Sequence, residues 1–159
     1  MKAAVLTVSD SAAAGTRDDA SGDLLAERLQ ADGFDVERRV VADERAVIGA
    51  AIAELSETAA LVLTTGGTGV APRDVTPEAT RDVLDRDAPG IAEALRADSI
   101  AKTPHGLLSR GVAGIRGSTL VVNLPGSTGG SRDGYDVLRP ALEHALRLLG
   151  EQTTTHAQT

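Results

Sequence analysis

The order of apolar and polar positions along the chain predicts short buried strands that alternate with amphipathic helices. The apolar run at residues 3–8 ends in Ser9 and Asp10, and the run at 60–63 leads directly into a glycine-rich loop. Continuous apolar runs of this length, closed by turn residues, are typical of strands buried on both faces of a parallel sheet. The predicted strands span residues 3–8, 35–41, 60–63, 112–116 and 119–123, with 112–116 as a short edge strand.

The segments between these strands carry apolar residues at helical spacing. Leu25 and Leu29 share one side of a helix that begins near Ser21 and ends at Gly33. Because a proline inside a helix removes a hydrogen bond, the last helical region is divided at Pro140. Of the other predicted helices, one carries apolar residues over 47–55 and a second begins at a capping Thr76. After a break at 89–90, a third covers 91–101, and the last two cover 127–138 and 140–149.

This alternation of strand, loop and helix predicts the fold class. Strands separated by helices pair in parallel, and the helices then cover the sheet. The sequence therefore predicts an α/β protein of three layers, with a mostly parallel sheet and helices on both faces. One domain spans residues 1–150, and the polar tail at 151–159, which lacks periodicity, is predicted to be disordered.

Composition and charge argue against several classes of function. The formal net charge is -7 and aromatic residues make up 1% of the chain, so no basic or aromatic-lined surface for nucleic acid is expected. The chain contains no cysteine, which excludes disulfides and thiolate metal sites. Its first residues lack the apolar segment of a signal peptide and no 18-residue apolar stretch occurs, which predicts a cytoplasmic protein without a membrane segment.

Four loops follow the predicted strands at the edge of the sheet where ligands of open α/β folds bind. They span residues 7–10, 42–44, 64–74 and 123–127, and we expect them to converge on one crevice. Because the net charge opposes an anion, a phosphate-bearing ligand there would depend on backbone N–H groups, a few arginines and a divalent cation.

The loop at 64–69, with the sequence TTGGTG, has the clearest potential to bind phosphate. Gly66, Gly67 and Gly69 expose backbone N–H groups and allow close approach of a ligand. A flexible turn between strand and helix would have the same composition, so the glycines alone leave both interpretations open. The loop is neither a Walker A motif, which requires Gly-Lys-Ser/Thr, nor a dinucleotide-binding fingerprint.

Two acidic positions near the predicted strand ends could hold a metal ion. Asp74 follows Arg73 on the same loop, and the two could hold a magnesium ion and a phosphate respectively. Asp43 lies where the helix after the second strand begins. Each carboxylate could instead cap a helix, with Arg73 facing solvent, and spacing alone leaves both interpretations open.

The three histidines do not suggest a catalytic cluster. His105, His144 and His156 are scattered over turn, helix and tail, which argues against a metal cluster or a Ser-His-Asp triad. If the attacking group is itself a phosphate, it is already anionic at neutral pH and needs no general base. Catalysis would then consist of positioning and charge neutralisation.

Seven short motifs occur in order between residues 3 and 149: LTVSD at 6–10, ADE at 42–44, TTGGTG at 64–69, PRDVTPEAT at 72–80, LSR at 108–110, GIRG at 114–117 and NLPGS at 123–127. Together they resemble the molybdopterin adenylyltransferase family of molybdenum-cofactor biosynthesis, which includes the G domain of gephyrin. The resemblance implies the molybdopterin-binding fold and a homotrimer. It also implies transfer of AMP from Mg-ATP to the terminal phosphate of molybdopterin, with release of pyrophosphate.

The same resemblance implies roles for individual residues. Asp43 and Asp74 match the essential carboxylates of the family, so we expect them to be catalytic and to bind Mg²⁺. The implied ligand-binding residues are Thr7, Ser9, Gly66, Gly67, Thr68, Gly69, Arg73, Ser109, Asn123, Pro125, Gly126 and Ser127.

The chain departs from the family pattern at two places. Ala42 stands where members often have proline, which should affect loop stiffness. Residues 128–130, Thr-Gly-Gly, stand where many members carry a lysine, so an anion contact from that side would come from Arg132 or from helix N–H groups.

Two other functions compete with catalysis. A paralogue could bind molybdopterin without adenylylating it, although the presence of both Asp43 and Asp74 favours an enzyme. A scaffold, the second role of gephyrin, needs additional domains. The resemblance also suggests that the product is handed to a metal-insertion protein, and it leaves open whether molybdenum or tungsten is the metal.

Overall fold

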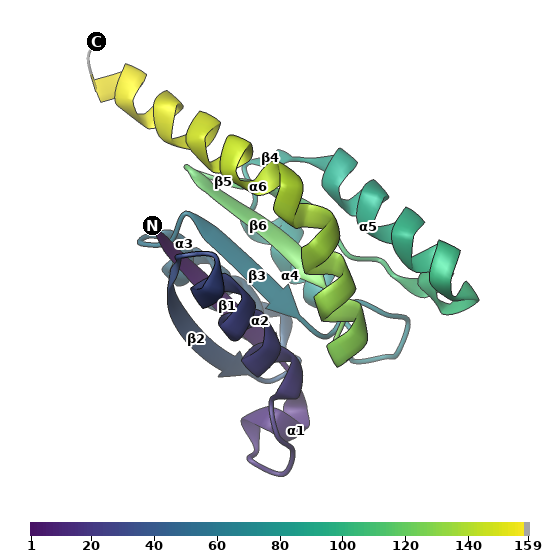
Figure 1. Ribbon diagram of the computed structural model, residues 1–159. Coiled ribbons are helices and arrows are strands. Elements are labelled where there is room, and N and C mark those ends of the chain that lie inside the picture. Colours follow the sequence, from purple (N-terminus) through teal and green to yellow (C-terminus); the bar gives the residue numbers. More distant parts are fainter. Residues whose placement is uncertain (158–159) are drawn as a thin grey trace.

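The computed structural model describes residues 1–157, which fold around one six-stranded sheet (Figure 1). The strand order is β2-β1-β3-β6-β5-β4. The four strands β2, β1, β3 and β6 run parallel, whereas β5 is antiparallel to β6 and β4 is antiparallel to β5. The strands are β1 Lys2–Val8, β2 Asp35–Val41, β3 Leu61–Thr65, β4 Arg86–Asp87, β5 Ala113–Arg116 and β6 Thr119–Leu124.

Helices cover both faces of this sheet, as Figure 1 shows with α2 and α6 in front of it and α3 and α4 behind it. On one face, Leu25 and Leu29 of α2 and Tyr135 of α6 pack with Val5 and Leu63 of the sheet. The helical elements are α1 Asp10–Ala13, α2 Ala20–Ala31, α3 Arg45–Ser56, α4 Thr76–Val83, α5 Pro89–Lys102, the 3-10 helix η1 Pro104–Leu108 and α6 Thr128–Ala157.

A second apolar core lies on the other face of the sheet. There, Ile48 and Ile52 of α3 and Ala79 of α4 pack against Leu6 and Val62. Alternate residues of the central strands β1, β3 and β6 therefore enter opposite cores, which requires these strands to be apolar at most positions. The predicted three-layer α/β fold is confirmed.

The connections place a topological switch point at the middle of the sheet. From β1 the chain crosses to β2 on one side, and from β2 it returns past β1 to β3 on the other side. Loops that leave β1 and β3 at their carboxyl ends therefore diverge and open a crevice between them. In register, Thr7 of β1 lies beside Thr65 of β3, so the LTVSD and TTGGTG motifs begin side by side.

The helix boundaries between α4 and α5 differ from those predicted. Helix α4 ends at Val83, because Arg86 and Asp87 pair with β5 as the edge strand β4. Pro89 does not break a helix but begins α5. Backbone N–H groups at the start of a helix have no acceptor within the helix, so a proline there removes no helical hydrogen bond. Local periodicity cannot reveal a two-residue edge strand, since its partner lies about 30 residues later in the chain.

The predicted division of the last helix at Pro140 is wrong. Helix α6 continues through Pro140 and past Leu149 to Ala157. An internal proline costs about 3 kcal/mol, whereas each buried leucine contributes about 1.5–3 kcal/mol. Leu138, Leu142 and Leu146 are all buried against the sheet, so an unbroken helix is favoured.

The end of α6 overlaps the tail that the sequence predicts to be disordered. Helical backbone is assigned as far as Ala157, and residues 158 and 159 lie outside the described part of the chain. The disorder of the tail at 151–159 stays a prediction. Within residues 1–157, no helix combines the length and the apolar character that crossing a membrane requires.

Candidate active site

A cavity of about 580 Å³ opens at the carboxyl ends of β1 and β3. All four predicted loops contribute to its lining: the first through Thr7 and Ser9, the second through Asp43, the third through Gly66, Gly67 and Asp74, and the fourth through Gly126 and Ser127. The predicted convergence of these loops on one crevice is therefore confirmed. The parallel register of the strands brings together residues that are far apart in the sequence.

The glycines of the TTGGTG loop are required by close backbone contacts. Gly66 and Gly67 have φ values of 100° and 69°, a region that residues with side chains rarely adopt. A Cβ atom on Gly66 would lie 2.3 Å from the carbonyl oxygen of Val8. A Cβ on Gly126 would lie 3.2 Å from the Cα of Gly66, so the TTGGTG and NLPGS loops touch. The loop is therefore closely packed against the end of β1 and the NLPGS loop.

The two predicted catalytic carboxylates lie against this loop. A Cβ atom on Gly67 would lie 3.2 Å from Oδ1 of Asp43, and one on Gly69 would lie 2.9 Å from Oδ2 of Asp74. A side chain at Gly69 would displace the carboxylate of Asp74. One at Gly67 would crowd the carboxylate of Asp43 and would collide with the Thr76 hydroxyl, which would lie 2.3 Å from its Cβ. Both carboxylates therefore lie close to the backbone of the glycine loop, Asp43 at Gly67 and Asp74 at Gly69.

Asp43 is held in place by Asp10 through a reciprocal pair of hydrogen bonds. The backbone N–H of Asp10 donates to Oδ2 of Asp43, and the backbone N–H of Asp43 donates to Oδ1 of Asp10, both at 2.9 Å. Burial raises the pKa of the Asp43 carboxyl, and the negative charges of Asp10 and Asp74 raise it further. Asp43 thus carries a charge that a nearby cation would stabilise.

Arg73, which the sequence predicts to bind phosphate, lines neither this cavity nor the second one described below. Its guanidinium forms a two-point contact with Asp10, with Nε 2.6 Å from Oδ2 and Nη2 3.0 Å from Oδ1. This hydrogen-bonded ion pair lowers the pKa of Asp10 below its usual value. Arg73 therefore links the loop that carries Asp74 to the loop that carries Asp10 and, through it, to Asp43.

Neither Asp43 nor Asp74 caps the helix that follows it in the sequence. The N-cap of α3 is Glu44 and the N-cap of α4 is Val75, and neither of these makes a side-chain capping bond. Asp74 instead accepts a hydrogen bond from the N–H of Ala71 at 3.0 Å within its own loop. The capping alternative is wrong for both carboxylates.

Thr76 is also not the predicted cap, because it is the first residue of α4. Its hydroxyl donates to the carbonyl oxygen of Gly66 at 2.9 Å, and its backbone N–H donates to the carbonyl of Gly67 at 3.1 Å. Thr76 therefore holds the glycine loop from behind. Among the described residues, the N–H groups of residues 67–70 donate no hydrogen bond to the protein.

A second cavity, of about 390 Å³, lies on the other side of the glycine loop. The two cavities share Ser127. Arg96 and Lys102 of α5 line the second one together with Asp98 and Asp133, and Lys102 is ion-paired with both carboxylates. Six of the predicted ligand-binding residues line it: Thr68, Gly69, Ser109, Asn123, Pro125 and Ser127. The predicted binding residues are thus distributed over two adjoining cavities, and Arg132 lines neither.

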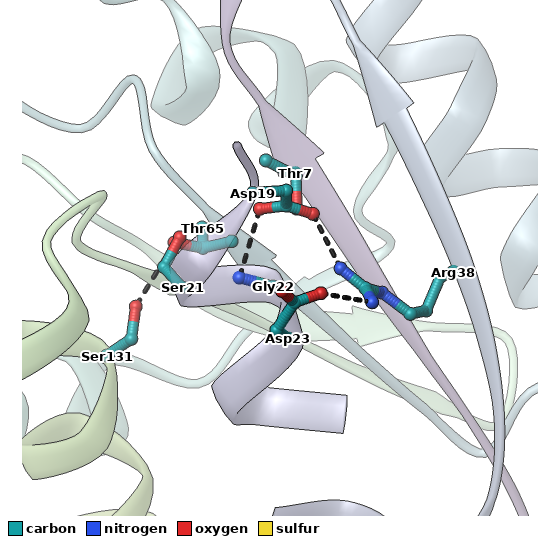
Figure 2. A network of polar contacts seen from close by, with 8 residues as sticks. All are labelled: Thr7, Asp19, Ser21, Gly22, Asp23, Arg38, Thr65 and Ser131. Carbon is teal, nitrogen blue, oxygen red and sulfur yellow. Dashed lines mark hydrogen bonds and ion pairs between the residues drawn. The ribbon is translucent and has the colours of Figure 1, made fainter. Parts of the chain in front are cut away.

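Several predicted ligand-binding side chains are engaged within the protein. The Thr7 hydroxyl donates to Oδ2 of Asp19 at 2.8 Å, and Asp19 also binds Arg38 and the N–H of Gly22, as Figure 2 shows. The hydroxyl of Ser127 accepts from the N–H of Gly130, as in an N-terminal helix cap. Ser9 caps α1 in a similar way.

Asn123 is also engaged internally. Its side chain is buried, with Oδ1 accepting from the N–H of Val112 and Nδ2 donating to the hydroxyls of Thr64 and Thr80 at 2.9 and 3.0 Å. Both amide hydrogens are therefore used inside the protein. Asn123 supports the wall of the second cavity from within.

Sequence reasoning assigned no role to three residues that shape this site: Asp10, Asp19 and Arg110. Asp10 and Arg110 belong to the LTVSD and LSR motifs, so their place in the motifs was the available signal. Asp19 precedes α2 and is its N-cap, a position where aspartate is common for structural reasons.

Comparison with known proteins identifies the family. A family model described as "probable molybdopterin binding domain" matches residues 4–144. The chain belongs to this molybdopterin-binding family. The molybdopterin adenylyltransferase of Helicobacter pylori (strain J99) is 37% identical over 150 residues, which cover 91% of this chain and 85% of that protein.

Other members of the molybdopterin-binding family show the same relationship. The solved structure of the molybdopterin biosynthesis Mog protein from Mycobacterium ulcerans superposes with a TM-score of 0.89 at 45% identity, over 93% of this chain and 98% of that one. The molybdenum cofactor synthesis protein cinnamon of Drosophila melanogaster is 38% identical over 97% of this chain, but the chain spans 27% of its length. These matches confirm the family and the fold that the seven motifs predict.

Proposed function

We propose that this protein transfers AMP from Mg-ATP to the terminal phosphate of molybdopterin and releases pyrophosphate. The observation that carries the proposal is the glycine loop, which has two carboxylates against it and lines two cavities. Four consecutive N–H groups of this loop have no acceptor within residues 1–157. Two cavities on either side of one phosphate-binding loop suit a reaction that joins two phosphate-bearing substrates. The relatives named for molybdopterin adenylyltransfer support this choice of substrates.

The chemistry requires little from side chains beyond placement and charge. A terminal phosphate oxygen of molybdopterin attacks the α-phosphorus of ATP, and the bond from that phosphorus to the β-phosphate oxygen breaks, so pyrophosphate leaves with its electron pair. The attacking oxygen is already anionic, so no group has to remove a proton. The N–H groups of residues 67–70, which have no acceptor among the described residues, would hold phosphate oxygens, and Gly66 and Gly126 would form one wall of the cavity.

The residues present fit a magnesium ion held jointly with the substrates. In the described part of the chain, no group of three His, Asp or Glu side chains is arranged to hold a metal. Mg²⁺ commonly uses one or two carboxylates together with water and substrate phosphates. Asp43 and Asp74 would provide these carboxylates. The pKa of Asp43 is raised first by burial and then by the negative charges of Asp10 and Asp74, and a cation would offset both effects. When bound, the ion would neutralise charge on the phosphate oxygens.

Incubation of the purified protein with molybdopterin and Mg-ATP tests the proposal directly. We expect adenylylated molybdopterin and pyrophosphate to form in equal amounts. Molybdopterin binding without either product would instead identify the chain as a non-catalytic molybdopterin-binding paralogue. Hand-over to a metal-insertion protein and a cytoplasmic location remain predictions of the sequence.

We further propose that the protein is a homotrimer. Much of α5 and η1 is exposed, and their apolar side chains include Leu107, which is 68% exposed, and Leu108 and Ile100, which are 49% and 42% exposed. A closed cyclic interface would remove such side chains from water. Light scattering at micromolar concentration should give three times the 16.3 kDa mass of one chain. A monomeric mass under the same conditions would contradict the proposal.

A further inference from the structure

We propose that Arg110 is a positioning residue that sets both the direction of the glycine-loop N–H groups and the location of Asp74. This inference rests on the proposed function, because it assigns those groups to the phosphates and to Mg²⁺. Arg110 lies between η1 and β5, more than 30 residues from Asp74 in the sequence. The Arg110 side chain nevertheless reaches Gly69 of the glycine loop, Asp74 in the segment after it, and Glu78 of α4.

The first contacts are with the glycine loop. The backbone N–H of Arg110 donates to the carbonyl of Thr68 at 2.8 Å, and its Nε donates to the carbonyl of Gly69 at 2.8 Å. Thr76 donates to the two preceding carbonyls, through its hydroxyl to that of Gly66 and through its backbone N–H to that of Gly67. Four consecutive carbonyl groups of the loop are therefore bound by two residues, Thr76 and Arg110.

This arrangement determines where the N–H groups point. In a planar trans peptide, the C=O of one residue and the N–H of the next point in opposite directions. Carbonyls 66–69 are bound to Thr76 and Arg110, so N–H groups 67–70 are directed away from those two residues. These are the four N–H groups that have no acceptor among the described residues. Arg110 thus helps to leave a row of backbone donors for an anion.

The second contacts are with the segment that carries Asp74. Nη2 of Arg110 donates to the backbone carbonyl of Asp74 at 2.7 Å, and Nη1 binds the carboxylate of Glu78 on α4. Gly69 and Asp74 are the two ends of an exposed loop, and Val70 at its start is 63% exposed. A single guanidinium therefore joins both ends of this loop to the start of α4.

The geometry favours a positioning role over direct binding of a ligand. Nε, Nη1 and Nη2 of Arg110 all donate to protein acceptors, and Glu78 balances the positive charge. A planar guanidinium can hold three acceptors in different directions, whereas a lysine ammonium cannot reach the same three.

The test compares Arg110→Lys with Arg45→Lys in the full-length chain. Arg45 is a matched control, because it pairs with Asp82 on the same helix α4 through bonds of 2.7 and 2.8 Å, but on the exposed surface. Each variant is examined for its melting temperature, for hydrogen exchange at the bonded N–H groups of Ala71, Asp74 and Thr76, and for kcat and KM with molybdopterin and Mg-ATP.

For Arg110→Lys we expect a cooperative melt, faster exchange at these three N–H groups, and a fall in kcat of about 10- to 100-fold, as small misplacements of reacting groups produce. Arg45→Lys should stay within about twofold of the unaltered protein, since exposed ion pairs contribute little. If Arg110→Lys does not fold, Glu78→Gln, which keeps an acceptor for Nη1, should show the same changes to a smaller extent.

Three results would overturn the positioning role. The first is unchanged turnover in Arg110→Lys, whether hydrogen exchange is unchanged or faster, which accounts for two of the three results. The third is reduced turnover with unchanged exchange, which would mean that Arg110 acts directly on a ligand. If the unaltered protein forms no adenylylated product, the proposed function fails. Exchange at Ala71, Asp74 and Thr76 would then still decide whether Arg110 holds the loop.

Discussion

Replacing Asp74 with asparagine should leave the protein folded and reduce kcat by on the order of 10² or more. Asparagine keeps the shape of the side chain and an oxygen that can accept from the N–H of Ala71, so the loop contact persists. Only the negative charge is lost. If Asp74 binds Mg²⁺ beside the phosphates, this charge acts mainly in the transition state, and the loss appears in kcat rather than in the binding of molybdopterin.

Asp85→Asn provides a matched control for this substitution. Oδ2 of Asp85 accepts from the backbone N–H of Gly117 at 2.6 Å in the turn between β5 and β6, at the opposite end of the sheet from the cavity. The control should turn over at the rate of the unaltered protein. Thermal melting shows whether each variant is folded, and single-turnover assays measure the chemical step. Normal turnover by a folded Asp74→Asn protein would leave Asp43 as the main catalytic candidate.

Removal of divalent cations with excess EDTA should abolish turnover, with a loss on the order of 10² or more, because a metal ion contributes several kcal/mol of charge stabilisation to phosphoryl chemistry. The net charge of -7 and the neighbouring carboxylates Asp10, Asp43 and Asp74 all oppose an ATP molecule that is not neutralised. Added Mg²⁺ should restore turnover. Full activity in EDTA would show that the protein needs no divalent cation.

Binding of Mg²⁺ should also be visible without any turnover. The folded-state pKa of Asp43 is raised, so the cost of ionising this carboxyl in the folded protein builds up as the pH rises to that pKa and is fully present above it. The cost disappears as the pH falls to the lower pKa of the unfolded state. A bound cation offsets the cost. The increase in melting temperature caused by Mg²⁺ should therefore be largest at neutral pH and should shrink as the pH falls through the raised pKa of Asp43. An increase that does not depend on pH would argue against Asp43 as a ligand.

The central strands of the sheet were predictable because each is marked by a short apolar run in the sequence. Residues 3–8 and 60–63 are apolar at nearly every position, since both faces of the parallel sheet are covered, and both segments form strands. Strand β3 is longer than predicted, because Thr64 and Thr65 pair in the ladder although they are polar. Their hydroxyls are satisfied inside the protein, by Asn123 for Thr64 and by Ser21, Ser131 and the carbonyl of Pro125 around Thr65.

The candidate site was predictable in its position but not in its contacts. The strand ends placed Asp43, Asp74 and the glycine loop at one edge of the sheet, and the cavity lies there. The sequence could not decide whether the two carboxylates cap helices, since a capping aspartate and a cavity aspartate occur at the same spacing. The reciprocal bonds between Asp43 and Asp10 decide the question for Asp43, and these residues are 33 positions apart.

The sequence by itself determined the fold class, the family and the edge of the sheet where ligands bind, because these follow from local periodicity and from motifs of a few residues. Only the tertiary structure decided that Arg73 pairs with Asp10 and that Arg110 reaches Gly69 and Asp74. It also decided that α6 continues through Pro140. In each case the deciding free energy comes from residues that are distant in sequence and adjacent in space, and local patterns carry no information about such contacts.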